Sequence, residues 1–235
     1  MTTIPVITID GPAGSGKGSI AARLAQHLGW WILDSGVLYR ALAWTVIHCQ
    51  VSPDDHTALE QLLSQIQVDL SARGHQVSWQ GQDITHDLRS EACASMASYL
   101  GADPVVRKQL LSLQRQCRHA PGLIADGRDM GTVVFPDATV KIFLQADALE
   151  RAMRRYKQLK QQGTNVTLHQ VEKDLQVRDE RDQNRSVAPL VPANDALQID
   201  TTHLSIEEVV ALILEQVEVK VPSSFPSPAC GRGLG

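Results

Sequence analysis

Short apolar runs alternate with amphipathic stretches along most of this chain. Continuous apolar runs of buried-strand length occur at 6–10, 30–33, 122–126, 140–144 and 196–200. Helical apolar spacing occurs at 17–28, 37–47 and 58–66, resumes from about 89, and ends in a helix over 205–217 with a Ser205/Glu208 capping box. Strands that alternate with helices predict an α/β fold, with a five-stranded parallel sheet flanked by helices and its ligand at the carboxyl ends of the strands.

The pattern changes character between residues 68 and 85. Val68-Asp69-Leu70 and Gln76-Val77-Ser78-Trp79 alternate apolar and polar residues, with residues 72–75 between them and another short strand over 83–85. Alternation of period two predicts antiparallel strands joined by tight turns. We therefore expect a small antiparallel β insertion in the α/β fold, within a segment of about 63–100.

Composition adds bounds on size and location. The chain has 235 residues, enough for one core that we place over 1–220. It has no export signal and no apolar run long enough to span a membrane, so we expect it in the cytoplasm with no membrane partner. We also expect a monomer. Residues 221–235, rich in proline and serine, predict a disordered tail.

Charge and cysteine content narrow the chemistry. The formal net charge is −4 and the sequence pI about 6.0, so no basic field favours a nucleic-acid partner. A small anion held by a local cluster of basic residues is the expected ligand. The four cysteines form no C-x-x-C pair, which leaves zinc and redox chemistry unsupported.

The sharpest motif follows the first predicted strand. It has the form G-x-x-x-x-G-K and consists of Gly11, Pro12, Ala13, Gly14, Ser15, Gly16, Lys17, Gly18 and Ser19. Glycines let consecutive N–H groups converge on phosphate oxygens, and a helix N-terminus adds the positive end of its dipole. We expect this P-loop to bind the triphosphate of ATP, with Lys17 at the β- and γ-phosphates; the alternative is an ordinary glycine-rich turn.

Two residues are candidates for binding the Mg²⁺ that accompanies ATP. Gly18 occupies the usual place of the magnesium-binding hydroxyl, which comes one residue later at Ser19. Asp126 ends a predicted strand, as the metal-associated aspartate of P-loop proteins does. Either residue would act directly or through water, and a strand-ending aspartate is also a common turn former.

Arginines and carboxylates gather in two further segments. Arg128 and Asp129 lie in the loop after a core strand, where a guanidinium suits phosphate and a carboxylate suits an exocyclic amine such as N4 of cytosine. In the run 178–185, helical spacing places Arg178, Arg181, Asp182 and Arg185 on one face. A polar stretch at 164–166 would hinge this run as a short helical lid over about 155–187. The alternatives are a loop salt bridge and a solvated, salt-bridged helix.

Four motifs together resemble the bacterial cytidylate kinases, which use CMP and dCMP, within the nucleoside monophosphate kinase family of P-loop proteins. They are 7–12 (ITIDGP), 33–36 (LDSG) with Tyr39-Arg40, 124–137 (IADGRDMGTVVFPD) and 185–190 (RSVAPL). The resemblance spans 7–217 and implies roles by position. It assigns Ser98, Arg107 and Asp129 to cytosine, Tyr39 and Asp182 to the ribose, and Ser35, Arg40, Arg128 and Arg185 to the acceptor phosphate.

The resemblance implies an enzyme that moves the γ-phosphoryl group of ATP·Mg²⁺ to CMP or dCMP. The negative charge that develops on the transferring phosphoryl group would then be neutralised by Lys17, Arg128, Arg178 and Arg185. One alternative is a kinase for another small acceptor, such as UMP or shikimate. Another is a switch that binds ATP and hydrolyses it slowly without any acceptor.

Overall fold

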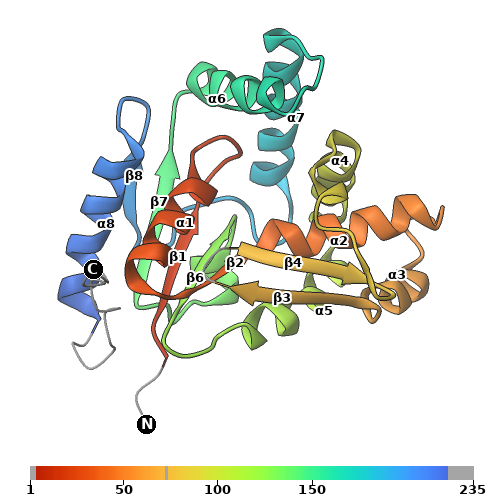
Figure 1. The fold of residues 1–235 in the computed structure, drawn as a ribbon, viewed down its shortest axis with the longest axis horizontal. Coiled ribbons are helices and arrows are strands. Elements are labelled where there is room, and N and C mark those ends of the chain that lie inside the picture. Colours follow the sequence, from red (N-terminus) through yellow and green to blue (C-terminus); the bar gives the residue numbers. More distant parts are fainter. Residues whose placement is uncertain (1–3, 72–73, 222–235) are drawn as a thin grey trace, which may run out of the picture.

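A computed structural model describes residues 4–71 and 74–221 (Figure 1). The tail predicted to be disordered lies outside these residues, apart from Val221. The strands are β1 Val6–Asp10, β2 Trp31–Asp34, β3 Ile66–Ser71, β4 Gly74–Trp79, β5 Gln82–Asp83, β6 Leu123–Gly127, β7 Val140–Gln145 and β8 Leu197–Asp200. The α-helices are α1 Lys17–Leu28, α2 Ser35–His48, α3 His56–Leu63, α4 Glu91–Leu100, α5 Pro104–Gln116, α6 Ala148–Gln161, α7 Leu168–Asn184 and α8 Ile206–Lys220.

The predicted five-stranded parallel sheet is confirmed. Its order is β2-β6-β1-β7-β8, with every pair parallel. Strands β1 and β6 are buried at every position, as their continuous apolar sequences require. Because β1 is central and its neighbours run parallel to it, the residues that follow β1, β2, β6 and β7 meet at one edge of the sheet.

Two apolar layers cover the sheet. On one face α1 and α8 pack against it through residues that include Ile20, Leu24 and Ile213. On the other face α2 and α5 pack with the insertion strands around Leu42, Leu110 and other buried residues. The predicted capping box begins α8: Ser205 accepts from the Glu208 N–H, and the Glu208 carboxylate accepts from the Ser205 N–H. In the part of the chain that the structure describes, no helix combines the length and apolarity of a membrane span.

The antiparallel insertion is confirmed as a sheet in the order β3-β4-β5, with two local corrections. The helix expected over 58–66 ends at Leu63, and Ile66 begins β3 opposite Trp79; an apolar residue four positions after Leu62 fits a helix and a strand equally well. The strand expected over 83–85 is shorter, because the Val77 N–H donates to the Thr85 hydroxyl instead of continuing the ladder. Of the segment expected to separate β3 from β4, residues 72–73 lie outside the described part.

Helices α6 and α7 pack against each other beyond the carboxyl edge of the sheet, at the top of Figure 1. They share a small apolar core of Ala152, Leu159, Val171 and Leu175, separate from the two main layers. The turn between them contains the polar stretch 164–166. One part of the predicted lid pattern is wrong: Arg185 follows α7 with an extended backbone (φ −63°, ψ 139°), so it does not share a helical face with Arg178.

Candidate active site

One cavity of about 1100 Å³ opens at the carboxyl edge of the sheet. Every site residue predicted from the sequence lines it, except Gly11 and Pro12 at the start of the P-loop. Its charged lining contains nine basic and four acidic side chains: Lys17, Arg40, Arg89, Arg107, Arg128, Arg154, Arg155, Arg178 and Arg185 against Asp34, Asp126, Asp129 and Asp182. The whole chain, with 22 basic and 26 acidic residues, is acidic. The cavity is therefore a local anion receptor on an acidic protein.

The P-loop curls over the N-terminus of α1. Gly14 has φ +79°, and a Cβ added there would lie 2.9 Å from the Arg151 carbonyl oxygen, so this position requires glycine. The Lys17 ammonium donates to the Pro12 carbonyl at 2.8 Å, within its own loop. Burial lowers the pKa of Lys17 to about 7, and the positive charge of Arg128 adds to that effect. A bound anion would oppose both effects by stabilising the charged ammonium.

Asp126 lies one residue before the end of β6, next to the P-loop. A Cβ added at Gly18 would lie 3.6 Å from Asp126 Oδ2, in ordinary van der Waals contact, and both residues line the cavity. Burial raises the pKa of Asp126 to about 6, although Lys17 opposes the shift. Within residues 4–71 and 74–221, no donor makes a hydrogen bond to this carboxylate. Ser19 is exposed on the first turn of α1 and lines the same cavity.

A buried arginine–carboxylate pair lies at the insertion side of the cavity. Arg107, from α5, donates to Asp129 Oδ2, and the exposed fractions of these side chains are 8% and 6%. Arg107 also donates to the Gly101 carbonyl at 2.9 Å and lies 6.0 Å above the centre of the Tyr39 ring. Arg185 Nη2 lies 3.8 Å from Asp129 Oδ1. Asp129 is thus held between two guanidinium groups.

The lid contributes a second set of charges. Arg128 Nε donates to Asp182 Oδ2 at 2.9 Å. Burial would raise the pKa of Asp182, but Arg128 holds it below its usual value. Arg178 is less well compensated: burial, followed by the charge of Arg128, lowers its pKa to about 10, and its Nε has no hydrogen-bond partner in the described part of the chain. An incoming phosphate would supply the missing acceptor.

The N-terminus of α2 supplies a further anion-binding element. Arg40 Nη2 donates to Asp34 Oδ2 at 2.6 Å, above Gly36, and Ser35 is buried in the first turn. His75 of β4 faces the same space. Burial lowers the His75 pKa, and its Nδ1 is buried with no hydrogen-bond partner among the described residues.

The predicted base-side residue Ser98, from α4, contacts the lid. Its hydroxyl accepts from Arg181 Nη1 at 2.9 Å. Arg155, from α6, donates to Glu91, which also belongs to α4. The lid therefore rests on α4 next to the insertion, and the two sides of the cavity are in contact.

Sequence reasoning missed the role of Asp10, the last residue of β1. Its two carboxylate oxygens accept from the Met130 and Gly131 N–H groups, each at 2.8 Å. These donors follow Asp129 directly, so Asp10 fixes the loop that carries it. Burial raises the pKa of Asp10 to about 7, and the two N–H donors oppose the shift. A signal was available: Asp10 is the one charged residue of an otherwise uncharged, buried strand.

The cavity also extends from the P-loop toward α8. There it is lined by Thr201, Leu204, Ile206 and Val209, with Arg154 opposite. Arg154 Nη1 donates to the Thr201 hydroxyl at 3.0 Å, which fixes the loop that follows β8. This part is more apolar than the arginine-lined side. Nothing in the sequence patterns pointed to it, because it joins segments that are far apart in the chain.

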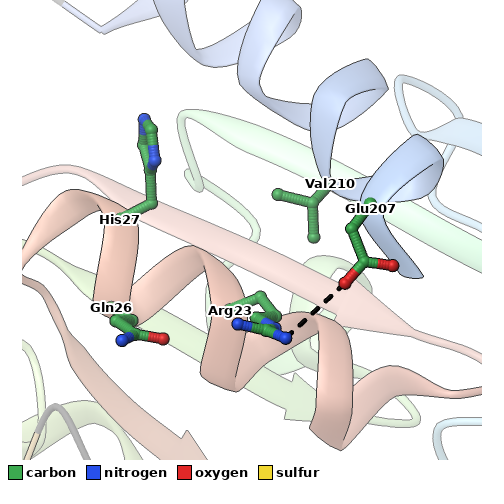
Figure 2. Close-up of a pocket in the computed structure, with 5 residues that line it drawn as sticks. All are labelled: Arg23, Gln26, His27, Glu207 and Val210. Carbon is green, nitrogen blue, oxygen red and sulfur yellow. Dashed lines mark ion pairs between the residues drawn. The ribbon is translucent and has the colours of Figure 1, made fainter.

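A second, smaller hollow of about 360 Å³ lies between α1 and α8 (Figure 2). Arg23, Gln26, His27, Glu207 and Val210 line it, and Arg23 pairs with Glu207 at 3.6 Å. Both partners are largely exposed, at 60% and 70%. Such pairs contribute little stability. The hollow contains no P-loop residue, so the large cavity is the candidate active site.

Comparisons with known proteins agree on one family. The family model for cytidylate kinase matches residues 7–219. A cytidylate kinase of Coxiella burnetii is 52% identical over 217 residues, covering 91% of this chain and 92% of its own length. One from Pseudomonas savastanoi pv. phaseolicola is 50% identical over 220 residues, covering 92% and 96%. One from Shewanella loihica is 49% identical over 221 residues, covering 93% and 96%.

A solved structure shares the fold at low sequence identity. The crystal structure of an uncharacterised protein from Eubacterium ventriosum aligns with a TM-score of 0.50 at 13% identity, covering 92% of this chain and 99% of its own. At this identity the likeness concerns the fold alone.

Proposed function

This chain belongs to the cytidylate kinase family, and on that premise we propose that it transfers the γ-phosphoryl group of ATP to CMP or dCMP, yielding ADP and CDP or dCDP. The observation that carries the proposal is the charge of the cavity: nine basic side chains against four acidic ones, on a chain of net charge −4. A single triphosphate needs only the P-loop side. The arginines on the opposite side call for a second, smaller phosphate.

The donor lies on the P-loop. Loop N–H groups and the N-terminus of α1 cradle its β- and γ-phosphates, and Lys17 leaves the Pro12 carbonyl to bind them. The base extends toward the apolar end of the cavity near Leu204 and Ile206. Negative phosphates restore the ordinary, high pKa of Lys17, so the ammonium is charged when the donor is bound.

The acceptor lies across from the donor, between the insertion and the lid. Arg40, Arg128 and Arg185 bind its phosphate, each turning from the carboxylate beside it. On the base side, the Asp129 carboxylate accepts from the N4 amino group of cytosine, and Arg107 and Ser98 complete the edge. Tyr39 and Asp182 lie at the ribose, and Ser35 lies at the phosphate.

Transfer is direct and in line, with no covalent intermediate on a side chain. The acceptor phosphate oxygen attacks the γ-phosphorus as the bond to the β-phosphate oxygen breaks. Arg178 and Arg128 approach the equatorial oxygens and stabilise charge there. Contact between the lid and α4 keeps water out, which protects the γ-phosphoryl group from hydrolysis.

The residues present fit a Mg²⁺ ion that arrives with the donor. Asp126 offers a buried carboxylate that lines the cavity beside Gly18 and accepts no hydrogen bond from the described residues. No group of three or more His, Cys, Asp or Glu side chains in residues 4–71 and 74–221 forms a metal site by itself, which suits an ion bound by one carboxylate, phosphates and water. Mg²⁺ would neutralise the donor's phosphates. Asp126 and Ser19 would orient it directly or through water.

An acceptor panel tests the function. ADP release is measured at fixed ATP and Mg²⁺ with CMP, dCMP, UMP, AMP or shikimate, and with no acceptor. The proposal predicts release that depends on CMP or dCMP, with kcat/KM for these two at least tenfold above that for UMP. Release that is independent of any acceptor would identify a switch, and a preference for another acceptor would identify a different kinase; either result contradicts the proposal. We also propose that the protein is a monomer and acts in the cytoplasm.

A further inference from the structure

A buried ion pair outside the predicted site joins the two lid helices. Arg151 Nη1, from α6, lies 2.5 Å from Asp179 Oδ2 of α7, and the exposed fractions of the two side chains are 10% and 13%. Neither residue lines the active-site cavity. The pair therefore does not touch a ligand in the arrangement described above, and its role must be indirect.

The same guanidinium also reaches the P-loop and the sheet. Arg151 Nη1 donates to the Ala13 carbonyl at 3.1 Å, and Arg151 Nε donates to the Ala146 carbonyl, just after β7, at 3.1 Å. One planar group thus binds the P-loop, the end of a core strand and the lid at the same time. A lysine, with a single compact ammonium, cannot reproduce this divided geometry.

Main-chain packing reinforces the contact. The tip of the P-loop at Gly14 lies against the Arg151 backbone, so closely that an added Cβ would meet Arg151 Cβ at 3.0 Å. Ala13 packs on the apolar core that α6 and α7 share. The base of the lid and the phosphate-binding loop therefore form one packed unit, with Arg151 at its centre.

The residue just before Asp179 on α7 connects this packed unit to the active-site cavity. Arg178 precedes Asp179 and lines the cavity, with its Nε lacking a hydrogen-bond partner in the described part of the chain. Asp179 Oδ1 is likewise buried without a hydrogen-bond partner there, so the ion pair that compensates this carboxylate is the one between Oδ2 and Arg151. Removing one partner of such a pair leaves an uncompensated buried charge, which costs more than the intact pair contributes.

We propose that Arg151 and Asp179 are a positioning pair: they fix α7 on the P-loop so that Arg178 faces the phosphates of the donor. The inference rests on the proposed donor site. It adds that the donor's phosphates and the lid arginine are coupled through Ala13, with no ligand contact by the pair itself. A pair that served stability alone would lower the melting temperature and leave the contribution of Arg178 unchanged.

A double-mutant cycle tests this coupling. Arg178→Ala is made in the wild type and in the Asp179→Asn and Arg151→Lys backgrounds, and kcat, the KM for ATP and the KM for CMP are measured for each protein. Asp179→Asn and Arg151→Lys should each raise the KM for ATP or lower kcat by about tenfold, with the KM for CMP changed less than about twofold. In either background, Arg178→Ala should then cost at most about a third of its factor in the wild type.

A control ion pair is that of Arg118 and Asp137, which meets at 2.7 Å far from the cavity, where Arg118 also donates to the Ile4 carbonyl; Asp137 is 59% exposed. Arg118→Lys and Asp137→Asn should leave all three constants within about twofold. The proposal is overturned if the Arg178→Ala factor is the same in every background, or if only the melting temperature moves.

Calorimetric binding of ATP without acceptor separates this inference from the proposed function. If the wild type binds ATP but shows no CMP-dependent turnover, the function fails, and the coupling is still read from binding. Arg151→Lys should then weaken ATP about tenfold, and Arg178→Ala should add little to that loss. An unchanged ATP affinity in Arg151→Lys would overturn the inference on its own.

Discussion

Three carboxylates that line the cavity are each paired with an arginine. Asp129 is bound by Arg107, Asp182 by Arg128 and Asp34 by Arg40. In the Arg107–Asp129 pair, which is almost fully buried, the carboxylate compensates the charge of the guanidinium. In the proposed reaction, we expect a phosphate or a base edge of a substrate to take over part of each interaction.

Asp129 is the residue that we expect to select the base. In Asp129→Ala the carboxylate that accepts from the cytosine amino group is lost, so the CMP preference over UMP in kcat/KM should fall by at least tenfold. The KM for ATP should change less than about threefold, because the P-loop is untouched. Steady-state kinetics with both acceptors measure this. A CMP/UMP ratio equal to that of the wild type would contradict the assignment.

Asp10 predicts a pH dependence of stability. Its pKa is raised from 3.8 to about 7, chiefly by burial, so between these values the folded state holds a proton that the unfolded chain releases. The contribution of Asp10 to stability therefore falls as pH rises from about 4 to 7, by at most about 4 kcal/mol. Asn at this position does not titrate. The melting temperature of Asp10→Asn minus that of the wild type should rise between pH 4.5 and 7.5, and a constant difference would refute this.

At the scale of elements, the P-loop depends on backbone conformation as much as on side chains. Gly14→Ala introduces a Cβ at φ +79° and forces it to within 2.9 Å of the Arg151 carbonyl oxygen. Gly81→Ala is a matched control, because Gly81 has φ +80° and its added Cβ meets nothing within 4 Å. Each substitution costs about 1 kcal/mol of backbone strain.

Only Gly14→Ala should affect the donor. We expect its ATP affinity, measured by calorimetry, to fall by at least tenfold, because the loop must move away from α6. Gly81→Ala should bind ATP as the wild type does, with a similar loss in melting temperature from strain. Equal ATP affinities in the two variants would show that contact between the loop and α6 is unimportant.

Most elements were predictable from the sequence because four of the five strands of the parallel sheet are short, largely apolar runs and the P-loop has fixed spacing. The fifth strand, β8, was expected to be buried, but only Ile199 is buried in it, because β8 is an edge strand of the sheet. The candidate site was predictable as a list of residues but not as a set of pairs. Arg107 and Asp129 are 22 residues apart, and Arg128 and Asp182 are 54 apart, so only the fold brings them together. No sequence pattern pointed to Arg151, because the Ala13 carbonyl to which it donates is 138 residues away. The roles of the site residues stay predictions.

For the whole molecule, the two sheets and helices α6 and α7 surround one cavity, in which we propose that the donor and the acceptor lie face to face. The P-loop and α8 bound one side, the β3-β4-β5 insertion and α4 bound the other, and α6 and α7 lie above both (Figure 1). The lid contacts the insertion side through Ser98 and Glu91. Because one lid contacts both sides, binding of either nucleotide should favour the geometry that the other requires.

The most direct test of two opposed phosphate sites is a crystal structure with CMP and a non-hydrolysable ATP analogue bound together. We predict the triphosphate on the loop around Lys17, with the Lys17 Nζ–Pro12 contact broken, and the CMP phosphate within hydrogen-bonding distance of Arg40, Arg128 and Arg185. A complex in which these three guanidinium groups keep their carboxylate partners and point away from CMP would contradict the account.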